Sequence, residues 1–430
     1  MESFNITFGL FLYFMFVFIG VICCKYTSIK LHSIINVTNC LTLPLIIICT
    51  IQVFLTYIFG LYYSIPPIEY WLVLILYIII TSIVEIFTNK CFDIYKITPT
   101  RLDDCFFYQG TGNINIILKY IIIIFILYAC YDSFIVVKNI DISMILQDEG
   151  QDEFGASMGG GFYARVFLMI IATYFFGYGN NWKDFGFGFL CLFPSLVINT
   201  KGIIFIPIVA GFIVRLYLKK IKNIKKLIVL IGLIGIIIFF SSYMWEFFTI
   251  GENPLSDSYR WQLISEKLLY YLTSGVQGFS ANLDNIYCSE IFSKYENITL
   301  APFNNFLSKF GITENVSAVS QHICYIGNLP TYGVCNSNVN TYIGTIYLYN
   351  CFFCGLLLHS FWVCITSIIR KLAFVNNQPF TVCLFALFAT GYALGWFEFY
   401  FMHTFWVYMI VMVIILNCFN SLKLNLNAKI

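Results

Sequence analysis

The segment SDSYRWQLISEKLLYYLTSGVQGFSANL, residues 256–283, lies inside the only long polar interval of an otherwise apolar chain. That interval runs from Trp245 to Asn340, between an apolar run at 227–244 and another that starts near Thr341. Membrane-crossing helices on both sides would fix its two ends at one membrane face. A loop held in this way can cover a cavity between helices, so the interval is the first place where we expect chemistry.

The composition indicates a membrane protein. Of the 430 residues, 60% are hydrophobic and 11% are charged, whereas a soluble protein carries roughly 25% charged residues. Apolar runs close to the ~20 residues that cross a bilayer recur along the chain. The first, Phe8 to Cys24, has no basic residues before it and no small-residue cleavage site after it, which favours a retained helix over a signal peptide. We therefore predict an all-α, polytopic membrane protein.

The apolar runs predict about 11 transmembrane helices in three parts of the chain. Residues 1–244 carry helices 1–8, residues 245–340 form one large loop, and residues 341–430 carry helices 9–11. The predicted spans are 7–24, 35–61, 69–88, 114–134, 161–178, 184–200, 202–218, 227–244, 341–366, 379–397 and 401–420.

Basic residues in short loops set the orientation of such a protein. One set of alternate connections holds nearly all of them outside the long loop: Lys25, Lys30, Lys90, Lys96, Arg101, Lys119, Lys183, Arg215, Lys219, Lys220, Lys222, Lys225, Lys226, Arg370, Lys371, Lys423 and Lys429. The other set holds Lys138, Arg165 and Lys201. We therefore expect the first set to be cytoplasmic, the 245–340 loop extracytoplasmic, the amino terminus outside and the carboxyl terminus inside.

Three basic residues on the predicted outer side run against this bias. Arg165 opens the fifth span, Lys201 lies in the turn INTKG, and Arg260 lies in the long loop. Cations near the interface are costly unless they reach lipid headgroups or meet an anion. A lipid-linked diphosphate is such an anion, and its oxygens suit the fork of an arginine. The alternative is that each cation contacts lipid headgroups or a local carboxylate.

The residues after Arg260 have the periodicity of a helix with a mostly apolar face. We expect Thr273-Ser274-Gly275 to end this helix. Its aromatic residues suit stacking against sugar rings: Tyr259, Trp261, Tyr270, Tyr271 and Phe279. An interfacial amphipathic helix with an aromatic belt explains the same pattern, and the two interpretations are compatible.

Three cysteines, Cys288, Cys324 and Cys335, lie in the long loop. If the loop faces an oxidising compartment, Cys324 and Cys335 can pair and leave Cys288 odd. The alternative is three free thiols.

A carboxylate and an imidazole are candidates for a general base. Glu398 lies in the short external turn GWFEFYFMH, close to His403, and His322 is the histidine of the long loop. Deprotonating a sugar hydroxyl requires such a group within hydrogen-bond reach. A solvated residue is the plain alternative for each, but a carboxylate between two spans needs a partner, which makes Glu398 the stronger candidate.

Sequence signatures of nucleotide and metal chemistry are missing from the chain. It contains no Walker A sequence, no Asp-x-Asp and no HExxH. The glycine run GASMGGG at 155–161 lacks the Lys-Ser/Thr pair of a phosphate-binding loop, and we interpret it as a flexible linker. We expect no metal, no cofactor and no nucleic acid.

The order of these features resembles a known family. The features are, in order, Arg165 at a span start, the turn NTKG before an apolar helix, YRWQLISEKLLYYLTSGVQGFSANL and SNVNTYIGTIYLYNCFFCGLL. Their order is similar to that of the Wzy-type oligosaccharide repeat unit polymerases, also called O-antigen polymerases. The likeness runs from about residue 160 onward. It implies a multi-pass, GT-C-like enzyme of the bacterial inner membrane with one large extracytoplasmic loop.

The resemblance also implies a reaction and roles for particular residues. The enzyme would transfer a polysaccharide chain from undecaprenyl diphosphate to the next lipid-linked repeat unit without a metal, beside a chain-length regulator of the Wzz type. Arg260 and Gly275 match a family pattern of an arginine followed by a glycine in the external loop. Lys201 stands where relatives have an arginine. Asn338 and Asn340 match a family Asn-Val-x-Thr stretch, and Glu398 matches an acid before the last span of some relatives.

Two other functions remain open at this point. An O-antigen ligase shares the donor and the large loop but uses lipid A core as acceptor. A lipid-linked oligosaccharide flippase or another transporter is a different class, but transporters usually show internal repeats and short loops. The 245–340 interval and the absence of a detectable repeat argue against a transporter.

Overall fold

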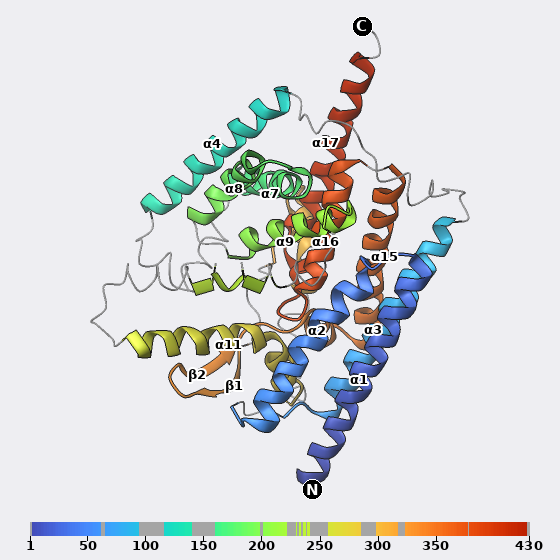
Figure 1. Ribbon diagram of the computed structural model, residues 1–430, viewed down its shortest axis with the longest axis vertical. Coiled ribbons are helices and arrows are strands. Elements are labelled where there is room, and N and C mark those ends of the chain that lie inside the picture. The colour runs from blue at the N-terminus through green and yellow to red at the C-terminus, as the bar shows by residue number, and fades with distance from the viewer. Residues whose placement is uncertain are drawn as a thin grey trace. The chain divides into compact units, whose positions relative to one another are not determined.

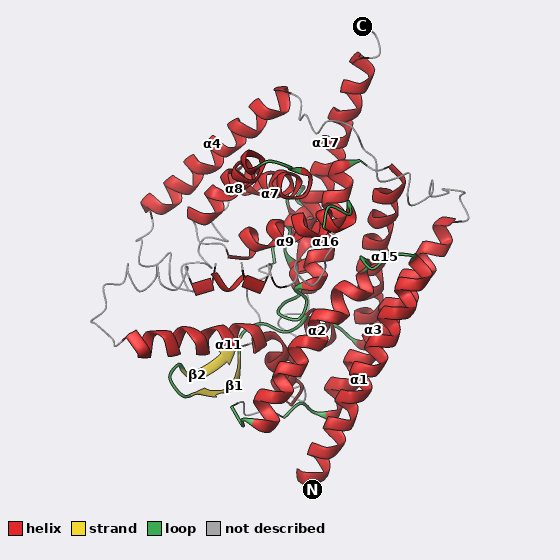
Figure 2. Cartoon of the chain, viewed as in Figure 1, coloured by secondary structure: helices red, strands yellow, loops and turns green. Residues whose placement is uncertain are grey.

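The computed structural model describes most of the chain, and the described residues are mainly helical (Figure 2). They are residues 2–61, 65–93, 116–139, 160–197, 201–221, parts of 229–240, 257–284, 298–316, 323–376 and 378–427. Within these ranges the sheet structure is a single two-stranded hairpin.

The chain divides into two compact units. The first comprises Met1–Lys96, Pro254–Ile368 and Gly391–Thr404, and the second comprises Ile97–Asn253, Ile369–Thr390 and Phe405–Ile430. Each unit is built from segments that are separate in the sequence. The first unit contains the amino-terminal helices, most of the long loop and a short carboxyl-terminal turn.

The first unit begins with three long helices (Figure 1). These are α1 (Glu2–Leu31), α2 (Val37–Val53), which the π-helical turn η1 (Phe54–Ile58) extends, and α3 (Ile68–Asp93). The described part of the long loop adds α11 (Asp257–Asp284), η2 (Ile298–Leu300), α13 (Ala301–Ser308), β1 (Cys324–Leu329) and β2 (Gly333–Ser337). The helix α14 (Tyr342–Leu348), most of α15 (Phe352–Asn376) and η3 (Tyr400–Met402) complete the unit.

The second unit is built around α7 (Gly160–Tyr178), which packs against its neighbours α4 (Ile116–Asn139), α8 (Trp182–Val197) and α9 (Lys201–Tyr217). It also contains the end of α15, most of α16 (Pro379–Ala393) and α17 (Phe405–Asn427). The run GASMGGG is interpreted as a linker from the sequence, but its last two glycines, Gly160 and Gly161, begin α7, close to the start of the predicted span 161–178. A Cβ on Gly161 would meet Asp132 Oδ2 of α4 at 1.8 Å, so this close approach requires a glycine.

Several helices are suited to a membrane. By length and composition, five of those described are long and apolar enough to cross one: Thr7–Leu31, Val37–Ile58, Ile68–Phe92, Gly160–Tyr178 and Phe352–Val375. Shorter apolar helices cover Tyr120–Ile135, Ile204–Tyr217, Pro379–Ala393 and Phe405–Cys418. The chain is therefore a mainly α-helical protein with the apolar helices of a membrane protein. The number of about 11 spans stays a prediction.

The bounds of one predicted span, 341–366, are wrong. This run forms two helices, because α14 ends at Leu348 and α15 begins at Phe352. In the break, the Asn350 side chain donates a hydrogen bond to the Ile346 carbonyl at 3.0 Å, and its Oδ1 accepts one from the Thr299 hydroxyl at 3.1 Å. An amide that serves both the preceding helix and the long loop stabilises a bend that hydropathy alone does not reveal.

A buried carboxylate fixes the start of α2. Glu85 of α3 is fully buried and accepts three hydrogen bonds of 2.9 Å, from the backbone N–H groups of Val37 and Thr38 and from the Thr38 hydroxyl. The first N–H groups of a helix have no partners within it and attract negative charge. The acid in the middle of an apolar run therefore ties α3 to α2.

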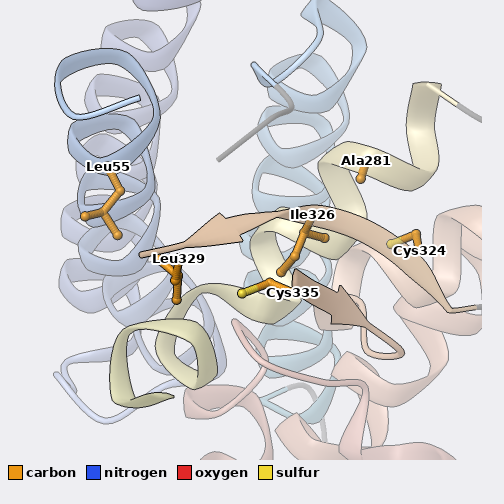
Figure 3. Close-up of a cluster of buried hydrophobic side chains, with 6 residues drawn as sticks. All are labelled: Leu55, Ala281, Cys324, Ile326, Leu329 and Cys335. Carbon is orange, nitrogen blue, oxygen red and sulfur yellow. The ribbon is translucent and has the colours of Figure 1, made fainter. Parts of the chain in front are cut away.

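The antiparallel hairpin β1–β2 packs on α11 through a small apolar cluster, which Figure 3 shows. Its buried members are Leu55, Ala281, Cys324, Ile326, Leu329 and Cys335. Cys324 and Cys335 are free thiols here, and burial raises their pKa values to about 12 and about 11. Of the two alternatives that the sequence left open for Cys324 and Cys335, the structure has the free thiols, and Cys288 lies outside the described residues.

Glu266 holds the turn of the hairpin to α11. Its Oε2 accepts hydrogen bonds of 2.7 Å from the backbone N–H groups of Thr331 and Tyr332. Burial raises the pKa of this carboxyl, but the hydrogen bonds from Tyr332, Thr331 and Gln262 outweigh burial and leave the pKa below its usual value. The charged form is therefore the one that stabilises the folded loop.

Candidate active site

The central part of α11 lies directly on the turn that carries Glu398. A Cβ on Gly275 would meet the carbonyl oxygens of Phe397 at 2.2 Å and Trp396 at 2.6 Å. A side chain at position 275 would force the backbone of α11 away from the backbone of the turn. The contact therefore requires the glycine at this position. The helix continues to Asp284, and the predicted end at Thr273-Ser274-Gly275 is wrong because this glycine serves close packing rather than a helix cap.

The segment that follows the hairpin completes the same junction. Thr341 N–H donates to the Gly275 carbonyl at 3.2 Å, and Tyr342 N–H donates to the Gly395 carbonyl at 2.6 Å. The Ser337 hydroxyl donates to the Ser274 carbonyl at 3.0 Å. Three segments that are distant in sequence therefore meet through backbone contacts, and we name this arrangement the α11 junction: the middle of α11, residues 337–342 and residues 395–398.

The two predicted asparagines have different environments at the α11 junction. Asn340 is fully buried, and its Oδ1 accepts a hydrogen bond of 3.0 Å from Asn282 Nδ2. Asn338 is exposed. Asn340 thus holds the junction together, whereas Asn338 is the asparagine that can reach a bound molecule.

Glu398 and His403 form a pair within this turn. Glu398 Oε1 lies 3.6 Å from His403 Nε2, and the two side chains are 15% and 30% exposed. A carboxylate beside an imidazole can accept a proton from a hydroxyl group and share it with its neighbour. The partner that the sequence required for Glu398 is therefore His403. The other candidate base, His322, lies outside the described residues.

The predicted aromatic residues divide into two groups. Tyr271 stacks on Phe397 of the α11 junction, with ring centroids 6.3 Å apart and planes at 16°. Tyr270 stacks on Tyr332 of the hairpin at 5.5 Å, and its hydroxyl donates to the Asn336 carbonyl at 2.5 Å. Tyr259 and Trp261, near the start of α11, are exposed at 42% and 55%. The exposed pair is therefore more available for stacking on a ligand.

Arg260 is not brought to Gly275. It lies fifteen positions before that glycine on the same helix, a path of about 22 Å along an α-helix. Its Nε is buried and has no hydrogen-bond partner within the described part of the chain. Arg260 is thus close in space to the exposed aromatic residues Tyr259 and Trp261, not to Glu398.

In the second unit, Arg165 pairs with a local carboxylate. Its Nη2 lies 3.0 Å from Asp132 Oδ2, and its Nη1 donates to the Ser133 hydroxyl at 3.0 Å. The Arg165 side chain is 3% exposed and that of Asp132 is 21% exposed. The structure therefore shows the alternative interpretation of Arg165, in which this cation contacts a local carboxylate.

Lys201 lies at the same end of its helix bundle as Arg165. The Ser133 hydroxyl that binds Arg165 donates to the carbonyl of Pro194 near the end of α8, and α9 begins at Lys201 shortly afterwards. The opposite ends of α7 and α9 also meet, since a Cβ on Gly177 would touch Val214. Two of the three predicted cations are therefore at one end of adjacent helices, and Arg260 belongs to the other unit.

A family model matches the chain over residues 57–426, and its description is a family of unknown function, DUF6337. The chain belongs to the DUF6337 family. No curated protein and no solved structure matches it. The match includes α11, the hairpin and the turn of Glu398 and His403, so the α11 junction lies entirely within the DUF6337 region.

Sequence reasoning missed a buried histidine beside the α11 junction of this DUF6337 protein. His359 of α15 is fully buried, with Nδ1 3.0 Å from the Tyr342 hydroxyl and Nε2 2.9 Å from the Thr81 hydroxyl. The backbone of Tyr342 binds Gly395 in the α11 junction. His359 therefore fixes the ring of Tyr342 beside the turn that carries Glu398. The available signal was a lone ionisable residue in the apolar run LLLHSFW, a kind of residue that marks functional positions in membrane proteins.

Asp132 and Glu85 are two further ionisable residues that the apolar runs contain and that sequence reasoning did not single out. Both have structural partners, Arg165 and the start of α2 respectively. Within the described residues, no three His, Cys, Asp or Glu side chains come together as a metal site would require.

Proposed function

We propose that this protein is a glycosyltransferase that polymerises undecaprenyl-diphosphate-linked oligosaccharide repeat units at the extracytoplasmic face of the bacterial inner membrane. The observation that carries the proposal is the Glu398–His403 pair, 3.6 Å apart, in a turn on which α11 of the long loop is seated. A loop that packs on the turn before such a pair is the arrangement expected of a cover over a reaction site. The resemblance to Wzy-type polymerases supplies the substrate class.

The proposed reaction requires a base and a site for the leaving group. Glu398, assisted by His403, takes the proton of an acceptor hydroxyl on the incoming repeat unit. The oxygen then bonds to the anomeric carbon of the growing chain, while the bond from that carbon to the diphosphate breaks. The diphosphate leaves with the electron pair, and fixed cations favour its departure because they act where negative charge develops.

The cations differ in how freely they could bind the diphosphate. Arg165 is already paired with Asp132, so a phosphate would have to compete with that carboxylate. Arg260 lies about 22 Å along α11 from Gly275, too far from Glu398 to hold a phosphate that departs there, so we assign Arg260 to the oligosaccharide. The exposed rings of Tyr259 and Trp261 beside Arg260 would stack on the sugars.

The decisive experiment is elongation by purified full-length protein supplied with a lipid-linked repeat unit, followed by gel analysis of chain length. We expect Glu398→Gln to reduce elongation by about 10²-fold or more, as loss of a general base does. Glu314→Gln is the matched control, because Glu314 is an exposed acid of the same loop. Elongation by the Glu398→Gln protein at the normal rate would remove this residue from the mechanism.

A second pair of variants tests the proposed role of Arg260 in substrate binding. Arg260→Ala should shorten the products, whereas Lys309→Ala, which removes an exposed cation of the same loop, should not. Deleting the gene separates the proposed polymerase from a ligase. A lost polymerase leaves single repeat units on lipid A, and a lost ligase leaves none.

A further inference from the structure

Two cysteines with C-x-x-C spacing begin α15. Cys351 occupies the position before the helix, and its carbonyl accepts the first helical hydrogen bond from Gly355 N–H at 2.8 Å. Its Sγ accepts a hydrogen bond from Cys354 N–H at 3.4 Å. The sulfur thus takes the place that a serine or aspartate oxygen takes at a helix start. The geometry directs the side chain of Cys351 toward the first turn, where Cys354 lies.

These two thiols differ from most other cysteines of the chain in their exposure. Both are exposed, as is Cys418, whereas the loop cysteines Cys324 and Cys335 are buried and have raised pKa values. Hydrogen bonds from the Cys354 thiol and the Cys354 backbone N–H lower the pKa of Cys351. An exposed thiol with a lowered pKa at the start of a helix is the kind that attacks disulfides.

We propose that Cys351 and Cys354 form a thiol–disulfide exchange site, with Cys351 as the attacking thiolate and Cys354 as the resolving thiol. The co-reactant is an accessible disulfide carried by a protein or a small thiol compound. This inference does not depend on the glycosyltransferase proposal.

The exchange is balanced in two steps. The Cys351 thiolate attacks one sulfur of the co-reactant, forms a mixed disulfide and releases the other sulfur as a thiolate. Cys354 then gives up its proton and attacks Cys351 Sγ, which closes the Cys351–Cys354 disulfide. The second thiolate leaves and takes up that proton. Two electrons pass from the cysteine pair to the co-reactant, which is reduced to two thiols.

The surroundings argue against a zinc site and suggest a different alternative. A structural zinc ion needs four ligands, and the described residues supply no third His, Cys, Asp or Glu near the pair. Phe352, Phe353 and Leu357 are exposed at 45%, 75% and 71%, so the pair lies on an apolar surface at the start of a membrane-length helix. A cysteine in that position could instead carry a thioester-linked acyl chain, which the experiment distinguishes.

The test uses the full-length protein in detergent, equilibrated in buffers of reduced and oxidised glutathione and then labelled with a maleimide that shifts its mobility on gels. We expect oxidising buffer to remove two labelled thiols from the wild type and from Cys418→Ser, and dithiothreitol to restore them. Cys354→Ser should retain glutathione on Cys351 as a mixed disulfide. Cys351→Ser should form neither product. Serine at position 351 can cap the helix through its oxygen, and serine at position 354 keeps the backbone N–H that donates to the cap, so both variants should elute normally in size-exclusion chromatography.

A rate measurement gives a second readout. At pH 7, Cys351 should react with iodoacetamide severalfold faster than Cys418, which is exposed but is not part of a C-x-x-C sequence. Equal rates, or two thiols that stay labelled throughout the redox series, would overturn the proposal. So would a blocked thiol that hydroxylamine releases and dithiothreitol does not, because that result identifies a thioester.

Discussion

At the scale of single residues, the buried pair Arg165–Asp132 shows what a charge inside this protein needs. Arg165 is 3% exposed and lies 3.0 Å from the carboxylate. Removing one member of such a pair leaves the other buried without compensation and costs about 3–5 kcal/mol, while replacing both by apolar residues is often nearly neutral. We therefore expect Arg165→Leu and Asp132→Leu to lower the thermal unfolding temperature, and the double variant Arg165→Leu/Asp132→Leu to recover most of it.

The same double variant separates packing from substrate binding. A recovered fold that still fails to elongate lipid-linked repeats would support the predicted contact between Arg165 and the diphosphate. A recovered fold that elongates normally would restrict Arg165 to its structural role. If the double variant is as unstable as the single ones, the ion pair is not what fixes these helix ends.

At the scale of elements, the contact of α11 with the turn before η3 depends on the absence of a side chain at Gly275. A Cβ there would lie 2.2 Å from the Phe397 carbonyl oxygen, which is backbone and cannot rotate away. Gly275→Ala should therefore destabilise the protein by about 1–3 kcal/mol, as other overpacked contacts do. Thermal unfolding of the purified protein measures this loss.

A glycine on another helix provides the control. Gly186 lies inside α8, and a Cβ there would meet nothing within 4 Å. Gly186→Ala should be neutral or stabilise the protein by up to about 1 kcal/mol, because alanine favours a helix. Equal loss of stability in both variants would contradict the importance of the α11 junction.

The helices show how far the sequence determines the elements. Apolar runs located α1, α2, α3 and α7 because a run of bilayer length can be recognised from hydropathy, and shorter apolar runs located α9 and α17. The end of α11 was not predictable, since a glycine that caps a helix and one that admits a neighbouring backbone look alike in sequence. The break between α14 and α15 depends on Asn350 and its partner Thr299 from the long loop, and no local pattern encodes a contact between such distant residues.

The candidate site could be predicted only in part for a similar reason. Glu398 and His403 are close in sequence, so their pairing follows from one short turn. The separation of Arg260 from Gly275 follows from the continuous helix between them, which the sequence already predicted up to this glycine. Asp132 and His359 acquire their roles through partners on other helices, and the sequence shows only that an ionisable residue interrupts an apolar run.

At the scale of the whole molecule, the orientation of the chain follows from where its cations lie. In the second unit, Arg215 Nε donates to the Phe176 carbonyl at 2.6 Å and Lys220 Nζ donates to the Tyr178 carbonyl at 2.6 Å. Cations at the carboxyl end of a helix are favourable because they meet unpaired carbonyl groups. These bonds bring the end of α7 and the end of α9 to one face of this unit, and the cytoplasmic location of that face stays a prediction.

Reporter fusions test this orientation directly. We expect alkaline phosphatase, which is active outside the cytoplasm, to be active when fused after Ser308 of the long loop and inactive after Lys220. A green fluorescent protein, which folds inside the cytoplasm, should show the opposite pattern and should also fluoresce when fused after Asn427. The basic residues near Lys220 and Asn427 favour the cytoplasmic side through the positive-inside rule. Fluorescence of the fusion after Ser308 would place α11, Glu398 and His403 on the cytoplasmic side. A lipid-linked donor presented at the outer face could then not reach them, and the polymerase proposal would have to be abandoned whatever the chemistry of the pair.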